Sequence, residues 1–158
     1  MHHKELKITA DGSHTLYIAA LDETYHSMHG AIQEAVHIFI NAGLNHFIGP
    51  KINVLEIGFG TGLNAFLTLL ENKNSDVEIN YTGIEAFPLD DNIVNQLNYV
   101  DELNSTNEEK QLFNTLLKVE WESYQKITDN FKLNKTKVTL DKFVTTEKFD
   151  VIYFDAFG

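Results

Sequence analysis

Cysteine is absent from this chain of 158 residues. Its absence excludes disulfide bonds, thiolate nucleophiles and most structural zinc sites. Proline occurs only twice, and the sequence contains neither an internal repeat nor a low-complexity linker. No apolar run approaches the length of a membrane span, and the first residues lack the charged, apolar and small segments of a signal peptide. We therefore expect a cytoplasmic location and no membrane partner.

Basic residues are scarce. Twelve Lys and Arg stand against 23 Asp and Glu, which gives a formal net charge of −11. An acidic chain repels the phosphate backbone of nucleic acids, whose affinity for proteins comes largely from Lys and Arg. A nucleic-acid partner therefore requires a local basic patch that the sequence does not display. The charge favours a small cationic ligand instead.

The rest of the composition is that of a globular chain. Hydrophobic residues make up 43% of the sequence, with 11 Phe and 6 Tyr among them, which excludes a disordered chain. A chain of this length can form one domain that buries roughly 68–70% of the surface exposed by its unfolded state.

Residues 1–50 show the pattern of a hairpin followed by a helix. The segment "LKITADGSHTLYI" places Asp11 and Gly12 between two β-favouring runs, which predicts a β-hairpin. In "GAIQEAVHIFINAGL", Ile32 and Val36 begin an apolar series at helical spacing. We therefore predict an N-terminal unit of hairpin and helix in this part of the chain.

Residues 51–158 alternate between buried strands and helices. The run "INVLEIGF" reads as a short, continuously apolar strand of the buried, parallel kind. "VEINYTGIEAFP" reads as the next strand and "KFDVIYFDAFG" as another buried strand. "FKLNKTKVTL" suggests either a short hairpin or a single strand. This alternation predicts an α/β sheet that binds ligands at the carboxyl ends of its strands.

Three glycines mark the turn between the first of these strands and the following helix. The dinucleotide fingerprint G-x-G-x-x-G would place its third glycine where Leu63 stands. The pattern present is instead Glu56-x-Gly58-x-Gly60-x-Gly62. Glycines let the backbone pass close to a ligand, and a helix N-terminus attracts a carboxylate. Because Glu56 can also hold an amino group, an amino-acid moiety fits this turn better than a pyrophosphate does.

Glu85 ends the next strand, where a carboxylate can accept two hydrogen bonds from ribose hydroxyls. An amino-acid site beside a ribose site describes S-adenosylmethionine, which we predict as the cofactor. Two alternatives stay open at this point: a tight glycine turn beside a surface glutamate, and a nicotinamide-binding domain.

Four segments, in the same order, resemble the methyltransferase domain of the MnmC family: "YHSMHGAIQEAVHIFINAGL", "LEIGFGTGLNAFLTL", "GIEAFPL" and "DVIYFDAF". The resemblance implies a class I S-adenosylmethionine-dependent methyltransferase with a Rossmann-like sheet of seven strands, one of them antiparallel. It also implies an enzyme that methylates the aminomethyl group of a modified wobble uridine, with tRNA as its partner. On this basis residues 1–50 are expected to cover the cofactor site.

The resemblance also assigns roles to individual residues. It implies that the glycine turn surrounds the methionine moiety, through Glu56, Gly58, Gly60 and Gly62. Glu85 is expected to bind the ribose. Asp155, in "DAF", is the expected catalytic residue, placed where it can accept a hydrogen bond from the incoming amine and take its proton.

Three further residues complete the predicted cofactor site. Tyr25 and Ser27, with His26 between them, belong to the family's N-terminal segment and are expected to close the pocket. Asp141 follows a predicted strand, at a place where this fold often contacts adenine. We predict no metal site, because Glu34-x-x-His37 is only one half of a di-iron pattern that needs two such motifs.

The family's methyltransferase domain continues beyond the strand that carries Asp155. We therefore expect residues 51–158 to contain only the first strands of the core, with an exposed sheet edge through which the chain could form a homo-oligomer. Two alternative functions remain open: a methyltransferase for a small-molecule amine, favoured by the acidic charge, and a non-catalytic fragment that binds the cofactor or another protein.

Overall fold

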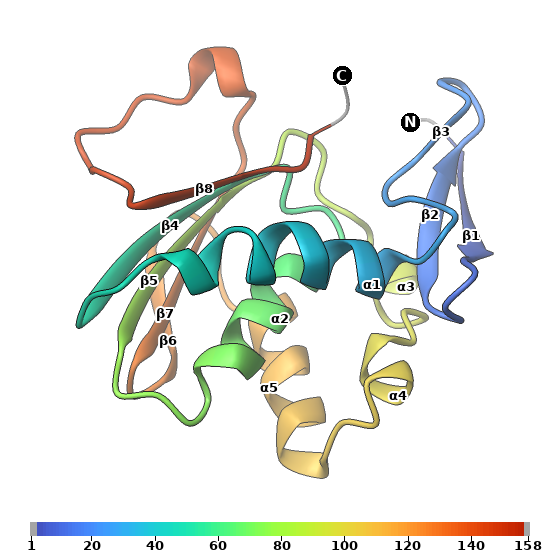
Figure 1. Ribbon diagram of the computed structural model, residues 1–158. Coiled ribbons are helices and arrows are strands. Elements are labelled where there is room, and N and C mark those ends of the chain that lie inside the picture. The colour runs from blue at the N-terminus through green and yellow to red at the C-terminus, as the bar shows by residue number, and fades with distance from the viewer. Residues whose placement is uncertain (1–2, 157–158) are drawn as a thin grey trace.

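The computed structural model describes residues 3–156 and contains two sheets (Figure 1). The smaller sheet is antiparallel and comprises β1 (Lys4–Ile8), β2 (His14–Ile18) and β3 (Glu23–Thr24). The predicted hairpin is confirmed, since β1 pairs with β2 in antiparallel register. The short strand β3 was not predicted; it pairs with the end of β2 and leads the chain towards the first helix.

The larger sheet has five strands in the order β6-β7-β5-β4-β8. Its parallel strands are β4 (Lys51–Ile57), β5 (Glu78–Ile84), β7 (Phe131–Thr136) and β8 (Val151–Phe154). The strand β6 (Tyr124–Thr128) runs antiparallel to β7, so the "FKLNKT" region is both a hairpin arm and a strand of the sheet. The predicted α/β architecture is therefore confirmed.

The helices differ in length and type. The first begins as α1 (Ala31–Ala35) and continues as a π-helix, η1 (Val36–Asn41), in which the Ala42 N–H donates to the His37 carbonyl at 3.1 Å. The longer α-helices are α2 (Leu63–Asn72) and α5 (Asn107–Lys118), the latter opened by a capping box between Thr106 and Glu109. Single turns form η2 (Leu44–His46), α3 (Asp91–Val94), α4 (Tyr99–Glu102) and η3 (Leu140–Lys142).

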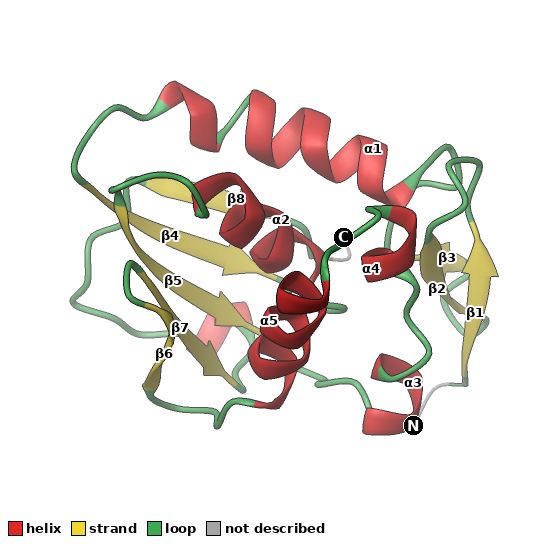
Figure 2. Cartoon of the chain, turned by 90° about the horizontal axis from the view of Figure 1, so that it is seen from below, coloured by secondary structure: helices red, strands yellow, loops and turns green. Residues whose placement is uncertain are grey.

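One face of the larger sheet carries the main core. The helix of residues 31–41, α2 and α5 all lie on this face (Figure 2). Phe66 of α2 packs on Phe113 of α5 with ring centroids 4.6 Å apart, and Phe39 packs on Tyr153 of β8 at 5.1 Å. Apolar side chains from before and after residue 50 therefore share one continuous core, and the division into units at that residue stays a prediction.

The opposite face has thinner cover. Leu55, Ile57 and Ile84 are buried there beneath the segment 137–150, which Figure 1 shows crossing above the sheet. Among the described strands β8 ends the sheet order, and its Ile152 and Phe154 are 59% and 62% exposed. The expected exposed edge is present, and oligomerisation through it stays a prediction.

Hydrogen bonds attach the small sheet to the first helix and to the core. The Asp11 carboxylate accepts the backbone N–H of Gln33 at 2.9 Å, beside the start of α1. The Asn98 side chain accepts the His14 N–H at 2.8 Å and donates to the Gly12 carbonyl at 2.9 Å. These contacts hold the β1–β2 hairpin against the start of α1 and against Asn98.

Candidate functional site

The glycine turn brings three chain segments together at the end of β4. Gly58 has a φ of 91°, and a Cβ atom there would lie 2.6 Å from the carbonyl oxygen of Asp155. Only glycine combines that backbone conformation with such a close approach. The carboxyl end of β8, and Asp155 with it, can therefore lie directly against the turn.

The other two glycines face different neighbours. A Cβ atom at Gly60 would lie 3.2 Å from the ring of Tyr25, which reaches the turn from the N-terminal segment. At Gly62 it would meet the side chain of Leu117 at 3.1 Å, so this glycine serves the packing of α5 against the turn. Gly62 also precedes α2, whose N-terminus is capped by no side chain of the described residues. That N-terminus can attract an anionic group.

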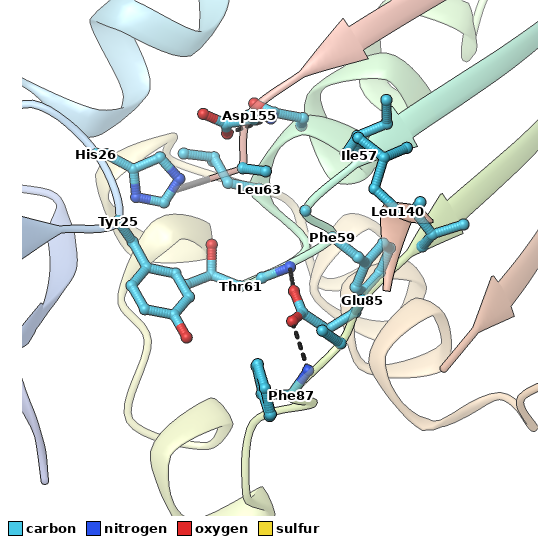
Figure 3. A pocket seen from close by; sticks show the side chains of 16 residues that line it. Tyr25, His26, Ile57, Phe59, Thr61, Leu63, Glu85, Phe87, Leu140 and Asp155 are labelled. Carbon is cyan, nitrogen blue, oxygen red and sulfur yellow. Dashed lines mark hydrogen bonds between the residues drawn. The ribbon is translucent and has the colours of Figure 1, made fainter. Parts of the chain in front are cut away.

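A cavity of about 200 Å³ lies over the turn. Its wall includes Gly58 and Gly60, while Gly62, Glu56, Ser27 and Asp141 are not part of it. Figure 3 shows Asp155 and His26 at one end of this cavity, and Glu85 and Phe87 at the other. Glu85 and Asp155 directly follow β5 and β8, which are the two neighbours of β4 in the sheet.

Glu85 is held by the backbone. Its Oε2 accepts the Gly60 N–H at 2.9 Å, and its Oε1 accepts the Phe87 N–H at 2.8 Å (Figure 3). Each carboxylate oxygen has a second lone pair. Glu85 is therefore fixed in the cavity wall and can still accept hydrogen bonds from a pair of hydroxyl groups.

Asp155 is oriented by a side chain that the sequence did not single out. Asn64 Nδ2 donates to Asp155 Oδ2 at 2.8 Å and to Glu56 Oε1 at 2.9 Å. Burial raises the pKa of Asp155 to about 6, against the Asn64 hydrogen bond, which lowers it, and with a smaller contribution from the charge of Glu34. Asp155 is thus a carboxylate that can accept a proton near neutral pH.

Glu56 lies behind the cavity wall. It is only 1% exposed, and the Tyr81 hydroxyl donates to its Oε2 at 2.8 Å. Burial raises the pKa of Glu56 well above its ordinary value, although the hydrogen bonds from Tyr81 and Asn64 oppose that shift. Glu56 therefore reaches the cavity through Asn64, and the direct contact with an amino group that the sequence predicted is not part of this arrangement.

Asn64 leaves one buried acceptor without a partner. The residue is 2% exposed, and no described residue donates a hydrogen bond to its Oδ1. A buried amide oxygen without a donor is costly, so Asn64 keeps this position at the expense of one unsatisfied acceptor. The available sequence signal was a polar residue between Leu63 and Ala65 in the first turn of a helix that is mostly apolar.

The N-terminal segment contributes Tyr25 and His26 to the cavity, and Ser27 to its neighbour. His26 lies at the same end of the cavity as Asp155 (Figure 3). Burial lowers the pKa of its imidazole to about 4, so the ring is neutral at neutral pH. Ser27 lines an adjoining cavity, and its N–H donates to Glu34 Oε2 at 2.8 Å. Tyr25 and His26 therefore line both cavities and Ser27 lines only the second, while closure of the site by this segment stays a prediction.

Asp141 is exposed on η3 and does not line the cavity, although its neighbour Leu140 does. Within residues 3–156, no group of three or more His, Asp or Glu side chains is placed to hold a metal ion. In the same part of the chain, no helix combines the length and apolar character needed to cross a bilayer.

Known proteins resemble the chain at two levels. A protein of Magnetococcus marinus described as the tRNA 5-methylaminomethyl-2-thiouridine biosynthesis bifunctional protein MnmC is 37% identical over 83 residues, which is 48% of this chain. The protein of the same description from Leptospira borgpetersenii is 34% identical over 76 residues, or 43% of the chain. Each match covers 12% of the relative's own length. No family model matches the chain.

A solved structure extends the comparison to the whole fold. The crystal structure of MNMC2 from Aquifex aeolicus covers all of this chain with a TM-score of 0.73 at 23% identity, and the chain covers half of that protein. The predicted fold class, an α/β chain with a Rossmann-like, mainly parallel sheet, is confirmed. The resemblance predicted from the four motifs is confirmed as well, because over part of its length the chain has homologues named MnmC.

Proposed function

We propose that the chain belongs to an S-adenosylmethionine-dependent N-methyltransferase that acts on the aminomethyl group of a modified wobble uridine in tRNA. The observation that carries this proposal is the convergence of Glu85 and Asp155 on one cavity, from the two strands that flank the glycine turn. The relatives' description as 5-methylaminomethyl-2-thiouridine biosynthesis proteins supports the choice of substrate.

The residues of the cavity fit the parts of the cofactor. The uncapped N-terminus of α2 suits the carboxylate of the methionine moiety. Glu85 suits the ribose hydroxyls. Leu140 and Phe87 line the cavity with Glu85 and offer apolar surface to the adenine. Asp141, the neighbour of Leu140 in the chain, would then lie at the rim of the adenine site.

S-adenosylmethionine, when bound, supplies an activated methyl group, so most of the protein's task is alignment, which can contribute about 7–11 kcal/mol. Asp155 would accept a hydrogen bond from the acceptor amine and then its proton, a role worth roughly 10²–10⁴-fold in rate. Asn64 keeps that carboxylate in place from behind. Because His26 is neutral at neutral pH, it adds no positive charge beside Asp155.

A second candidate is methylation of a small-molecule amine. The net charge of −11 favours it, since such a charge opposes a polyanionic substrate. A fragment that only binds the cofactor or a protein is the third candidate. Three further predictions stand apart from the choice of function. They are a cytoplasmic location, coverage of the site by residues 1–50, and assembly through the β8 edge.

The test is methyl transfer to tRNA from cells that lack this modification. The chain, S-adenosylmethionine and that tRNA are incubated, and the nucleosides are analysed by mass spectrometry. Conversion of aminomethyl-uridine to methylaminomethyl-uridine is the expected result. Transfer to free amines but not to tRNA would favour the small-molecule candidate, and absence of both would contradict the proposed activity.

A further inference from the structure

A second cavity, of about 460 Å³, adjoins the first on the side of the helix of residues 31–41. Both cavities are lined by Tyr25, His26 and Asp155. The second one adds Glu34 from α1 and Phe154 from β8. Asp155 therefore stands where two cavities meet, one of which the cofactor would occupy.

The charges of the second cavity have one sign. Two carboxylates, Glu34 and Asp155, line it, and none of its lining residues is Lys or Arg. The imidazole of His26 carries no compensating charge at neutral pH, because burial lowers its pKa. Carboxylates that face each other without a cation repel, so a ligand that carries a positive charge would be stabilised there.

Glu34 is placed to make a directed contact. Its Oε2 accepts the Ser27 N–H at 2.8 Å, and this hydrogen bond fixes the orientation of the carboxylate. Its Oε1 accepts no hydrogen bond from the residues that the structure describes. One oxygen thus anchors the side chain to the closing segment, and the other can accept a hydrogen bond from a ligand.

We propose that the second cavity binds the methyl acceptor as a primary ammonium ion on a flat base, and that Glu34 is the residue that selects the charged amine. This inference rests on the proposed function. Phe154 and Tyr25 both line this cavity, which places aromatic residues where a planar base can pack. The ammonium then lies between Glu34 and Asp155.

The arrangement divides the chemistry between the two carboxylates. Glu34 binds the ammonium, and Asp155 accepts one of its protons. The nitrogen lone pair released in this way forms the new N–C bond with the methyl carbon, while the electron pair of the breaking C–S bond leaves with the sulfur. Glu34 acts on selection and position and does not take part in bond formation.

The experiment compares two nucleosides that differ in one group. The chain is saturated with S-adenosylhomocysteine, and 5-aminomethyluridine or 5-hydroxymethyluridine is titrated by calorimetry at neutral pH. The chain should bind the amine at least about tenfold more tightly than the alcohol, as expected for a hydrogen bond between charged groups. Glu34→Gln, which keeps an acceptor for the Ser27 N–H, should remove most of that preference.

A matched control removes the same charge elsewhere. Glu120 is exposed and lies outside the lining of both cavities. Glu120→Gln should keep the preference for the amine, and both variants should bind S-adenosylhomocysteine with unchanged affinity. An equal preference in the Glu34→Gln variant, or no preference in the unaltered chain, would overturn the inference alone. Failure of the unaltered chain to bind S-adenosylhomocysteine would overturn the proposed function and, with it, this inference.

Discussion

Asn64 Nδ2 lies 2.8 Å from Asp155 Oδ2, and this single hydrogen bond joins the helix after the glycine turn to the proposed catalytic carboxylate. The same nitrogen donates to Glu56, whose other oxygen accepts the Tyr81 hydroxyl. Asp155 is thus the outer end of a hydrogen-bonded series that begins in the core. Because each member is held by the next, the position of Asp155 depends in part on Glu56 and Tyr81, which do not line the cavity.

Replacing Asn64 tests this series. In Asn64→Leu the hydrogen bond that lowers the pKa of Asp155 is lost, so that pKa should rise above about 6. The pH at which methyl transfer reaches half its maximum should rise with it, and the maximal rate should fall by roughly tenfold or more. A pH–rate profile measures both effects. An unchanged midpoint would show that Asn64 does not act on Asp155.

The buried carboxylate of Asp155 is needed for the proposed activity, and its ionisation should lower the stability of the folded chain. Its pKa is raised from 3.8 to about 6 in the folded chain, so the folded state binds more protons than the unfolded state between those values. Stability contributed by this group is therefore greatest in acid and is lost as the pH rises through about 6.

Asp155→Asn removes that charge and keeps an oxygen for Asn64. The variant should lose methyl transfer and should melt at a higher temperature than the unaltered chain at about pH 8. The difference in melting temperature should shrink towards about pH 4, where the carboxyl group is protonated. Thermal unfolding of both chains across this range gives the comparison. A melting temperature of the variant below that of the unaltered chain at high pH would contradict the account.

Gly58→Ala tests the contact between the turn and β8. A methyl group would meet the Asp155 carbonyl oxygen at 2.6 Å, and alanine at a φ of 91° is strained. We expect a loss of about 1–3 kcal/mol in the free energy of unfolding, together with reduced methyl transfer as Asp155 is displaced. Chemical denaturation measures the first effect. Full stability and activity in this variant would show that β8 does not depend on the turn.

Much of the site followed from the sequence because glycines and strand ends are local signals. The turn at residues 58–62 and the carboxyl ends of the strands carrying Glu85 and Asp155 could be placed from apolar runs alone, and the sheet brings those ends together. Whether the side chain at each position points into the cavity or away from it could not be predicted in the same way.

Glu56 and Asn64 illustrate the difference. Glu56 lies in a strand, where successive side chains point to opposite faces, and its face is the buried one next to Tyr81. Asn64 could be assigned to a helix, but its contact with Asp155 depends on how that helix rotates against a strand 91 residues away. The orientation of the Glu34 carboxylate likewise depends on the path of residues 23–30, because Ser27 in that segment donates to it. No local sequence pattern predicts that path.

A calorimetric titration decides whether the cavity over the glycine turn binds S-adenosylmethionine with Glu85 on the ribose. The chain should bind one equivalent, and Glu85→Gln should weaken binding by about tenfold or more, as expected when hydrogen bonds to a charged group are weakened. Glu71→Gln, which removes the same charge from an exposed position at the far end of α2, should leave the affinity unchanged. Absence of binding, or equal affinity in the Glu85→Gln variant, would contradict the account.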